Sequence, residues 1–193
     1  LDRKGRINTI YAGRDRERMF RRTEELAKVG GWEINFETNS GGWSDEVRRI
    51  HEVPDDYQPT LETGLSFFSP ADQQTLRTAA ERAVTEGTPW VFEGELTTAK
   101  GRKIWVRTTG EPVRENDKIV GLVGAVQDIT DLRQVEHALR ESETLFRAIA
   151  EQMTDALFVV DFGGKERGGR ILYANPAAAR MHGMRVEEII GLP

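Results

Sequence analysis

Residues 119–130 read IVGLVGAVQDIT, a run of apolar and small residues that gives way to a polar end. Valine and isoleucine alternating with small residues favour a β-strand. Asp128 and Thr130 are typical of helix starts, because their side-chain oxygens accept hydrogen bonds from free backbone N–H groups. The stretch therefore predicts a strand over residues 118–127 that leads directly into a helix.

Four other strands are expected upstream of this one. Two of them lie over 90–98 and 103–113. A turn at Lys100-Gly101 joins these two strands, and a turn at 115–117 joins the second to the strand over 118–127, which makes an antiparallel meander. The others lie at 32–36, where apolar and polar residues alternate, and around Trp43. The predicted fold class is α+β, a five-stranded antiparallel sheet with helices on one face.

Helices are expected over three stretches of this first part. The first covers residues 14–29 and is ended by Gly30-Gly31. The second follows Ser44 and ends at Pro54, and the longest runs from Pro70 to about residue 86, with Ser69 as its cap.

A connector helix is expected after Thr130. Its apolar side chains recur at 3-4 spacing, which is a heptad pattern. They are Leu132, Val135, Leu139, Phe146 and Ile149, with Ser142 in the same series. Two interpretations remain open: a surface helix that packs on its own domain, or a parallel dimeric coil that links two domains.

The element order recurs late in the chain. Strands are expected at 157–161 and 171–174, and Asn175-Pro176 begins another helix. The segment 119–130 closely resembles the last strand of PAS domains, which often ends in Asp-Ile-Thr before a linker helix. Trp43-Ser44-Asp45 and residues 173–178, Tyr-Ala-Asn-Pro-Ala-Ala, resemble the start of that fold.

The resemblance implies a tandem PAS arrangement from a bacterial-type signalling protein. It places the end of a preceding PAS domain at 1–15, a PAS domain at 16–130, a helical connector at 131–150 and the first half of a second PAS domain at 151–193. It implies a sensory or dimerising module that signals through the connector, with Asp128 and Thr130 as transmission residues, to an output domain such as a histidine kinase or a diguanylate cyclase. The fragment itself is not expected to be an enzyme.

Strand alternation predicts which side chains face the helices. The candidate pocket residues are Phe36, Leu76, Phe92, Leu96, Ile104, Val106, Leu122 and Val126. Photosensory flavin-binding relatives of the PAS type place amides where Leu96, Val106 and Val126 stand here, and also use a cysteine, which this chain lacks. Haem-binding ones take a histidine from the long helix, which has none, while His51 is interpreted as a polar or half-buried residue of an earlier helix. We therefore expect neither flavin nor haem, and leave open a small apolar ligand or none.

The opposite sheet face carries polar residues around Trp105. Glu95 and Arg107 are expected to pair across the strands. The early helix, through Met19 and Leu26, is expected to cover Trp105, with a partner subunit as the alternative.

Composition limits the partners. The net charge of −5 with both signs interspersed argues against nucleic acid, and no apolar run reaches the roughly 20 residues that cross a bilayer. The absence of cysteine and of an apolar leader fits a cytoplasmic location. We expect a homodimer joined to an output domain in the same parent chain. The rivals are a PAS spacer that binds nothing and a small α+β enzyme, which lacks an evident acid–base pair.

Overall fold

A computed structural model describes residues 18–19, 21–38, 40–116, 118–163 and 169–192. The chain forms two compact units, one up to Arg133 and one from Gln134. The strand expected within residues 1–15 lies outside the described residues.

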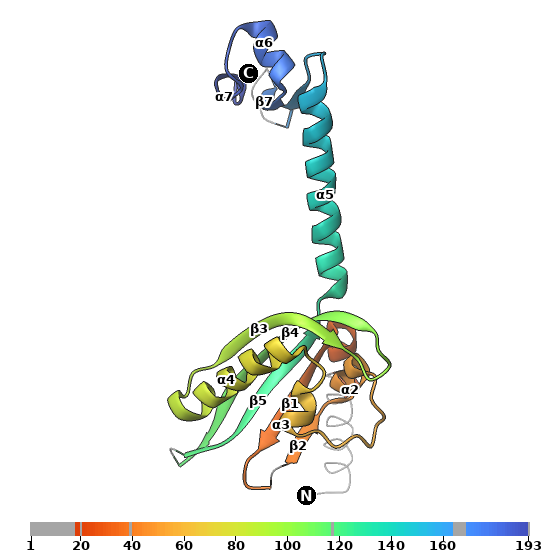
Figure 1. The fold of residues 1–193 in the computed structure, drawn as a ribbon, viewed down its shortest axis with the longest axis vertical. Helices are drawn as coiled ribbons and strands as arrows, with labels where there is room; N and C mark the ends of the chain where they lie inside the picture. Colours follow the sequence, from red (N-terminus) through yellow and green to blue (C-terminus); the bar gives the residue numbers. More distant parts are fainter. Residues whose placement is uncertain (1–17, 20, 39, 117, 164–168, 193) are drawn as a thin grey trace, which may run out of the picture. The chain divides into compact units, whose positions relative to one another are not determined.

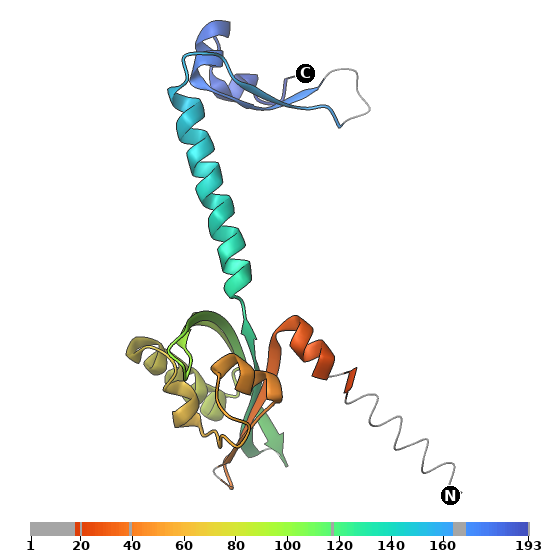
Figure 2. The same ribbon diagram turned by 90° about the vertical axis from the view of Figure 1, so that its right-hand side faces the viewer.

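The first unit contains a five-stranded antiparallel sheet in the order β2-β1-β5-β4-β3, which confirms the predicted fold class (Figure 1). Helices α2, α3 and α4 cover one face of the sheet (Figure 2). The strands are β1 (Val29–Asn35), β2 (Ser40–Trp43), β3 (Trp90–Thr97), β4 (Lys103–Glu115) and β5 (Lys118–Asp128). The helices are α2 (Asp45–His51), α3 (Leu61–Leu65) and α4 (Pro70–Glu86).

Alternation along the strands places the predicted apolar face against the helices. Leu96, Ile104, Val106, Leu122 and Val126 are all buried there. On the same face, Leu76 from α4 and Ile50 from α2 join the main core cluster. The prediction of strand faces is therefore confirmed for β3, β4 and β5.

The end of the first helix differs from the prediction. Residues 21–27 are helical, Lys28 takes a left-handed conformation with φ 51°, and β1 begins at Val29. Gly30 and Gly31 lie inside the strand and do not end the helix. Gly30 is small for a packing reason, since a Cβ there would lie 2.5 Å from the backbone nitrogen of Val47 in α2.

The second unit is built around a hairpin. Helix α5 (Thr130–Gln152) leads into β6 (Phe158–Asp161) and β7 (Arg170–Ala174), followed by α6 (Pro176–His182) and α7 (Val186–Ile189). The two strands and α6 agree with the expected elements. Asn175 is completely buried: its amide nitrogen donates to the carbonyls of Ala150 and Asp155, and its Oδ1 accepts from the N–H groups of Leu157 and Ala178. This single side chain ties the end of α5 to the hairpin and to α6.

Two glycines form the floor at the centre of the first sheet. Gly110 of β4 and Gly124 of β5 are register partners. A Cβ on Gly110 would collide with the indole of Trp90. One on Gly124 would lie 1.9 Å from the carbonyl oxygen of Thr109 and 2.6 Å from Cζ2 of Trp32. The missing side chains therefore let two tryptophan rings lie directly on the backbone of the inner face.

We expect Gly110→Ala and Gly124→Ala each to destabilise the first unit by roughly 1–3 kcal/mol. At Gly110 the Trp90 indole must leave its position, and at Gly124 both the Trp32 indole and the backbone at Thr109 must shift. Gly31→Ala is the matched control in the same sheet, since its Cβ would meet nothing closer than the Gly124 carbonyl at 3.9 Å. Urea unfolding monitored by tryptophan fluorescence measures the three variants. Equal stability of all three would contradict this account of the glycine floor.

Candidate functional site

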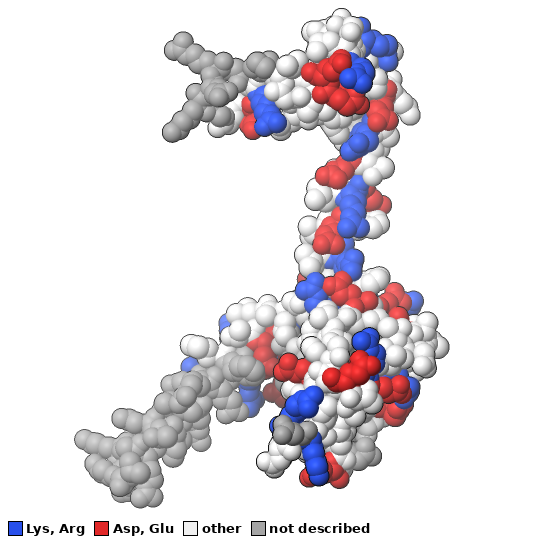
Figure 3. All heavy atoms as spheres, turned by 90° about the vertical axis from the view of Figure 1, so that its left-hand side faces the viewer, with Lys and Arg blue, Asp and Glu red and all other residues white. Residues whose placement is uncertain are grey.

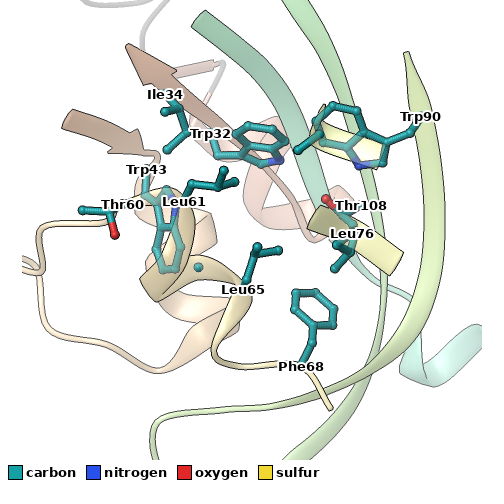
Figure 4. A pocket seen from close by; sticks show the side chains of 12 residues that line it. Trp32, Ile34, Trp43, Thr60, Leu61, Leu65, Phe68, Leu76, Trp90 and Thr108 are labelled. Atoms are coloured by element: carbon teal, nitrogen blue, oxygen red, sulfur yellow. The ribbon is translucent and has the colours of Figure 1, made fainter. Parts of the chain in front are cut away.

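A small cavity lies between the inner face of the sheet and helices α3 and α4 (Figure 4). Its volume is ≈ 70 Å³, well below the roughly 300–1,000 Å³ of typical small-molecule pockets. Aromatic and aliphatic side chains dominate its walls. The lining residues are Trp32, Ile34, Trp43, Thr60, Leu61, Gly64, Leu65, Phe68, Leu76, Ala80, Trp90 and Thr108.

The cavity differs in position from the pocket expected from the sequence. Of the eight candidate residues, Leu76 lines it. Leu96, Ile104, Val106, Leu122 and Val126 are packed into the core, where Leu65, Phe68 and Leu76 or the alanines of α4 cover them. Phe92 is partly buried against the same core. The inner face is therefore filled along most of its length, and space remains at the tryptophan end.

Phe36 is a clear correction. It follows the last residue of β1, is 38% exposed, and borders a shallow surface groove beside Val84 of α4. Its side chain shares that groove with Leu61 and Leu122, so Phe36 lies on the helix side of the sheet but at its edge, where no other side chain covers it fully.

The sequence reasoning missed Trp32, Trp43 and Trp90 as cavity residues. The centroids of the Trp32 and Trp90 rings lie 5.9 Å apart with a tilt of 36°. A signal was present in the sequence, because alternation places Trp32 with Ile34, and Gly110 with Thr108, on the inner face. Where large rings on one strand lie over glycines on the neighbouring strand, gaps can remain between the sheet and the helices, so this pattern indicates a possible cavity.

The cavity is apolar with few polar groups. None of its described lining residues carries a charge. The positions compared with flavin-binding relatives, Leu96, Val106 and Val126, are buried aliphatic residues that offer no hydrogen bond. Among the described residues, no group of three or more His, Cys, Asp or Glu is placed to hold a metal ion.

His51 is more deeply buried than expected, with 2% exposure rather than a half-buried position. Its Nδ1–H donates to the carbonyl of Val47 at 2.8 Å, and its ring lies 4.3 Å from Trp43 and 4.9 Å from Phe67, centroid to centroid. The aromatic surroundings hold the imidazole neutral, since burial lowers the pKa of His51 to about 4. It acts as a packing residue of α2.

The low pKa of His51 makes stability depend on pH. Its folded pKa of about 4 lies below the ordinary value of 6.5, so the unfolded chain binds a proton first as the pH falls. We therefore expect the neutral, buried His51 to contribute about 3 kcal/mol to the free energy of unfolding above pH 6.5. This contribution is lost as the pH falls from 6.5 to about 4. Urea unfolding at several pH values should show a smaller loss in His51→Gln than in the wild type. His137→Gln changes an exposed histidine and should match the wild type; identical pH profiles for all three proteins would contradict the assignment.

The second candidate site is the junction between β5 and α5. Asp128 Oδ1 accepts from the N–H of Thr130 at 2.9 Å, and Thr130 Oγ1 accepts from the N–H of Trp105 at 3.0 Å. The N–H of Ile129 donates to the carbonyl of Trp105 at 2.9 Å. The start of α5 is thus bonded to Trp105, near the beginning of β4. Asp128 and Thr130 lie at the strand-to-helix junction as predicted, although the Thr130 hydroxyl accepts from the strand and not from the helix.

Ion pairs reinforce this junction on the outer face of the sheet. Lys28 Nζ lies 2.6 Å from Asp131 Oδ2, and this hydrogen bond raises the pKa of Lys28. Glu93 of β3 accepts from Arg107 Nε at 2.7 Å and also from Arg133 of α5. The bonds from Arg107, then Arg133, hold the pKa of Glu93 below its usual range. The first turn of α5 is therefore connected to β3, β4 and the residue before β1.

Two expectations for this face are wrong. Arg107 pairs with Glu93, and Glu95 pairs with Lys103 at 2.7 Å, because the register places Arg107 opposite Glu93. Trp105 is covered in part by Arg133, whose Cζ lies 5.0 Å from the ring centroid. The early helix does not cover it, since Met19 and Leu26 are 72% and 76% exposed.

The connector helix presents an unburied apolar row. Leu132, Val135, Leu139, Phe146 and Ile149 are each between 45% and 67% exposed. Charged side chains of both signs alternate along the same helix (Figure 3). No helix in the described part of the chain is long and apolar enough to span a membrane.

Two family models match this chain. One, described as PAS fold, matches residues 41–126, and the other, described as PAS domain, matches residues 144–193. The chain belongs to the PAS family. The match of the first model covers the cavity's strands and helices from β2 to β5, and the second covers the β6–β7 hairpin with α6 and α7.

The relatives of this PAS protein include two proteins that are much longer than this chain. It is 28% identical over 84% of its length to the sensor protein FixL of Bradyrhizobium diazoefficiens, and 21% identical over 88% to the probable diguanylate cyclase DgcE of Escherichia coli. The chain spans 32% and 15% of those two proteins. A solved sensory box histidine kinase/response regulator from Burkholderia thailandensis shares the fold, with a TM-score of 0.51 and 24% identity over 67% of this chain and 98% of that one.

Proposed function

We propose that this PAS chain is a sensory and dimerising regulatory segment that passes a signal through α5 to an output domain in the same parent chain. An output of the histidine kinase or diguanylate cyclase type would suit the relatives. The observation that carries the proposal is the junction, where the start of α5 is bonded to the strands that also wall the cavity.

The geometry explains how such a signal would travel. Gly124, which lies under Trp32 in the cavity, and Asp128, which bonds the first N–H of α5, belong to the same strand β5. A displacement of β5 or β4 at the cavity would therefore move the residues that hold the helix. No flexible linker separates the two, because β5 ends at Asp128 and α5 begins at Thr130.

We expect Asp128→Ala and Thr130→Ala to change the output of the full-length parent protein, because each removes a side chain that bonds sheet and helix together. Each should cost about 0.5–2 kcal/mol of stability. Thr130→Ser keeps the hydroxyl and is the matched control. The measurement is output activity with and without stimulus, beside thermal unfolding of the same proteins; normal signalling by both alanine variants would show that the junction does not transmit.

A second copy of this chain is the proposed partner of the apolar row on α5. The row follows a heptad pattern over more than two heptads, and oppositely charged residues flank it, as in a parallel coil. An apolar stripe this exposed in a single copy is unfavourable in water, and pairing two helices would cover it. Output enzymes of the proposed kinds would then be brought together by the same helix.

We expect Leu139→Asp combined with Val135→Asp to shift the protein from dimer to monomer, because unpaired charges in the seam are costly to bury. These positions avoid Phe146, whose ring contacts Tyr173 at 5.3 Å within the second unit. Thr144→Asp adds a single negative charge on the opposite side of the helix and should remain dimeric. Sedimentation at tens of micromolar, roughly the range that detects weak dimers, distinguishes the three proteins; a monomeric wild type would refute the dimer.

One observation favours a second candidate, a structural PAS spacer. The cavity of ≈ 70 Å³ is small for a ligand site, and most of the inner face is filled by side chains. Native mass spectrometry before and after denaturation separates the two functions, since a sensor purified with its ligand loses mass on denaturation and a spacer does not.

A further inference from the structure

The outer face of the first sheet carries a row of small, uncharged residues that crosses its strands. The register pairs Val91 of β3 with Thr109 of β4. It also pairs Thr109 with Ala125 of β5, and Ala125 with Gly31 of β1. Strand alternation turns all four away from α2, α3 and α4, so they form one continuous surface, the outer band. Two shallow hollows of ≈ 440 Å³ and ≈ 330 Å³ lie along it and share Val123, so the outer band is an open depression.

Two carboxylates line one edge of the outer band. Glu111 of β4 and Glu33 of β1 lie on either side of Val123 in the next row of the register. Both are exposed, and neither forms an ion pair with a described residue. At the opposite edge, by contrast, Glu93 and Arg107 neutralise each other. The depression therefore has unmatched negative charge along one edge only.

The helix that enters the first unit is held on α2 by charged side chains. Residues 18–19 and 21–27 are helical. Arg21 pairs with Asp45 of α2 at 3.3 Å, and Glu25 lies 3.8 Å from Arg49 of α2. Arg21 and Glu25 are four residues apart and share one side of the helix. These contacts fix which side of the entering helix points away from its own unit.

The opposite side of the entering helix is uncharged and exposed. Met19, Thr23 and Leu26 recur at 4-3 spacing, so they share that side and form what we call the entry stripe. Arg18 and Arg22 follow one edge of the stripe, and neither forms an ion pair with a described residue. The entry stripe thus has unmatched positive charge along one edge, which makes it the counterpart of the outer band.

We propose that the entry stripe of one copy packs into the outer band of a second copy. The arginine edge of the stripe then faces the glutamate edge of the band, and such opposite charges fix the register of an interface. Within one copy the stripe and the band are both open, so they do not meet there. In a two-fold dimer the contact is made twice, because each copy presents both surfaces. The inference rests on the proposed dimer and assigns it a contact besides the apolar row on α5.

Cross-linking between copies tests the contact directly, because the chain has no cysteine of its own. A protein with Thr23→Cys in the entry stripe is mixed with one that has Ala125→Cys in the outer band, and the mixture is treated with the short thiol cross-linker bismaleimidoethane. We expect roughly tenfold more cross-linked heterodimer than from Thr23→Cys mixed with Glu115→Cys, since positioned thiols have a much higher effective concentration than colliding ones. Glu115 is the matched control because it is exposed at the end of β4, away from the band.

Charge reversal then tests the pairing of the two edges. Arg18→Glu with Arg22→Glu reverses the stripe, and Glu33→Arg with Glu111→Arg reverses the band. Either reversal should lower the cross-linked yield several-fold when it is present in one partner, the stripe reversal in the Thr23→Cys protein or the band reversal in the Ala125→Cys protein. Both together should restore the yield, because both contacts of the heterodimer then join opposite charges again. All four positions are exposed, so the fold should be kept in each protein.

The outcomes separate this inference from the proposed function. Equal yields with the Ala125 and Glu115 partners, or no recovery when both reversals are present, would overturn the contact between stripe and band. The apolar row on α5 is tested by sedimentation of the Val135 and Leu139 variants. A dimer that is seen in sedimentation but gives no cross-link from stripe to band refutes this inference alone, whereas a monomeric wild type refutes both.

Discussion

The pairing of β5 with both β1 and β4 is the constraint on which the rest of the first unit depends. The strand lies at the centre of the sheet, with Trp32 opposite Gly124 on one side and Gly110 opposite Gly124 on the other. Its last residue, Asp128, donates its N–H to the carbonyl of Lys28 at 3.0 Å and bonds the first residue of α5. One strand thus closes the sheet, supports the cavity and begins the connector.

The two faces of this sheet have different physical roles. On the inner face, aliphatic side chains fill the layer between strands and helices, except where two glycines carry tryptophan rings. On the outer face, ion pairs and the Arg133–Trp105 contact join the strands to the first turn of α5. Exposed ion pairs add little stability individually. We therefore interpret this network chiefly as fixing the orientation of the first turn of α5 relative to the sheet.

His51 of the first unit and Asn175 of the second are two buried polar residues with different roles. His51 is kept neutral among aromatic rings and bonds within its own helix. Asn175 uses all four of its hydrogen-bonding positions to join separate segments of the second unit. Fully bonded polar side chains of this kind specify an arrangement more strongly than apolar contacts do, because few other arrangements satisfy them.

The sequence by itself determined the element order, the fold class and the helix start at Asp128 and Thr130, because alternation, caps and turn residues act over a few positions along the chain. It also determined which strand residues face the helices. The tertiary structure decided the register, and with it the pairing of Arg107 with Glu93 rather than Glu95. It also decided where space remained, since a cavity is what packing leaves unfilled: the predicted aliphatic residues became core, while Trp32 and Trp90 over paired glycines made the site. Such a residual volume depends on the fit of side chains far apart in the sequence, which no local pattern contains.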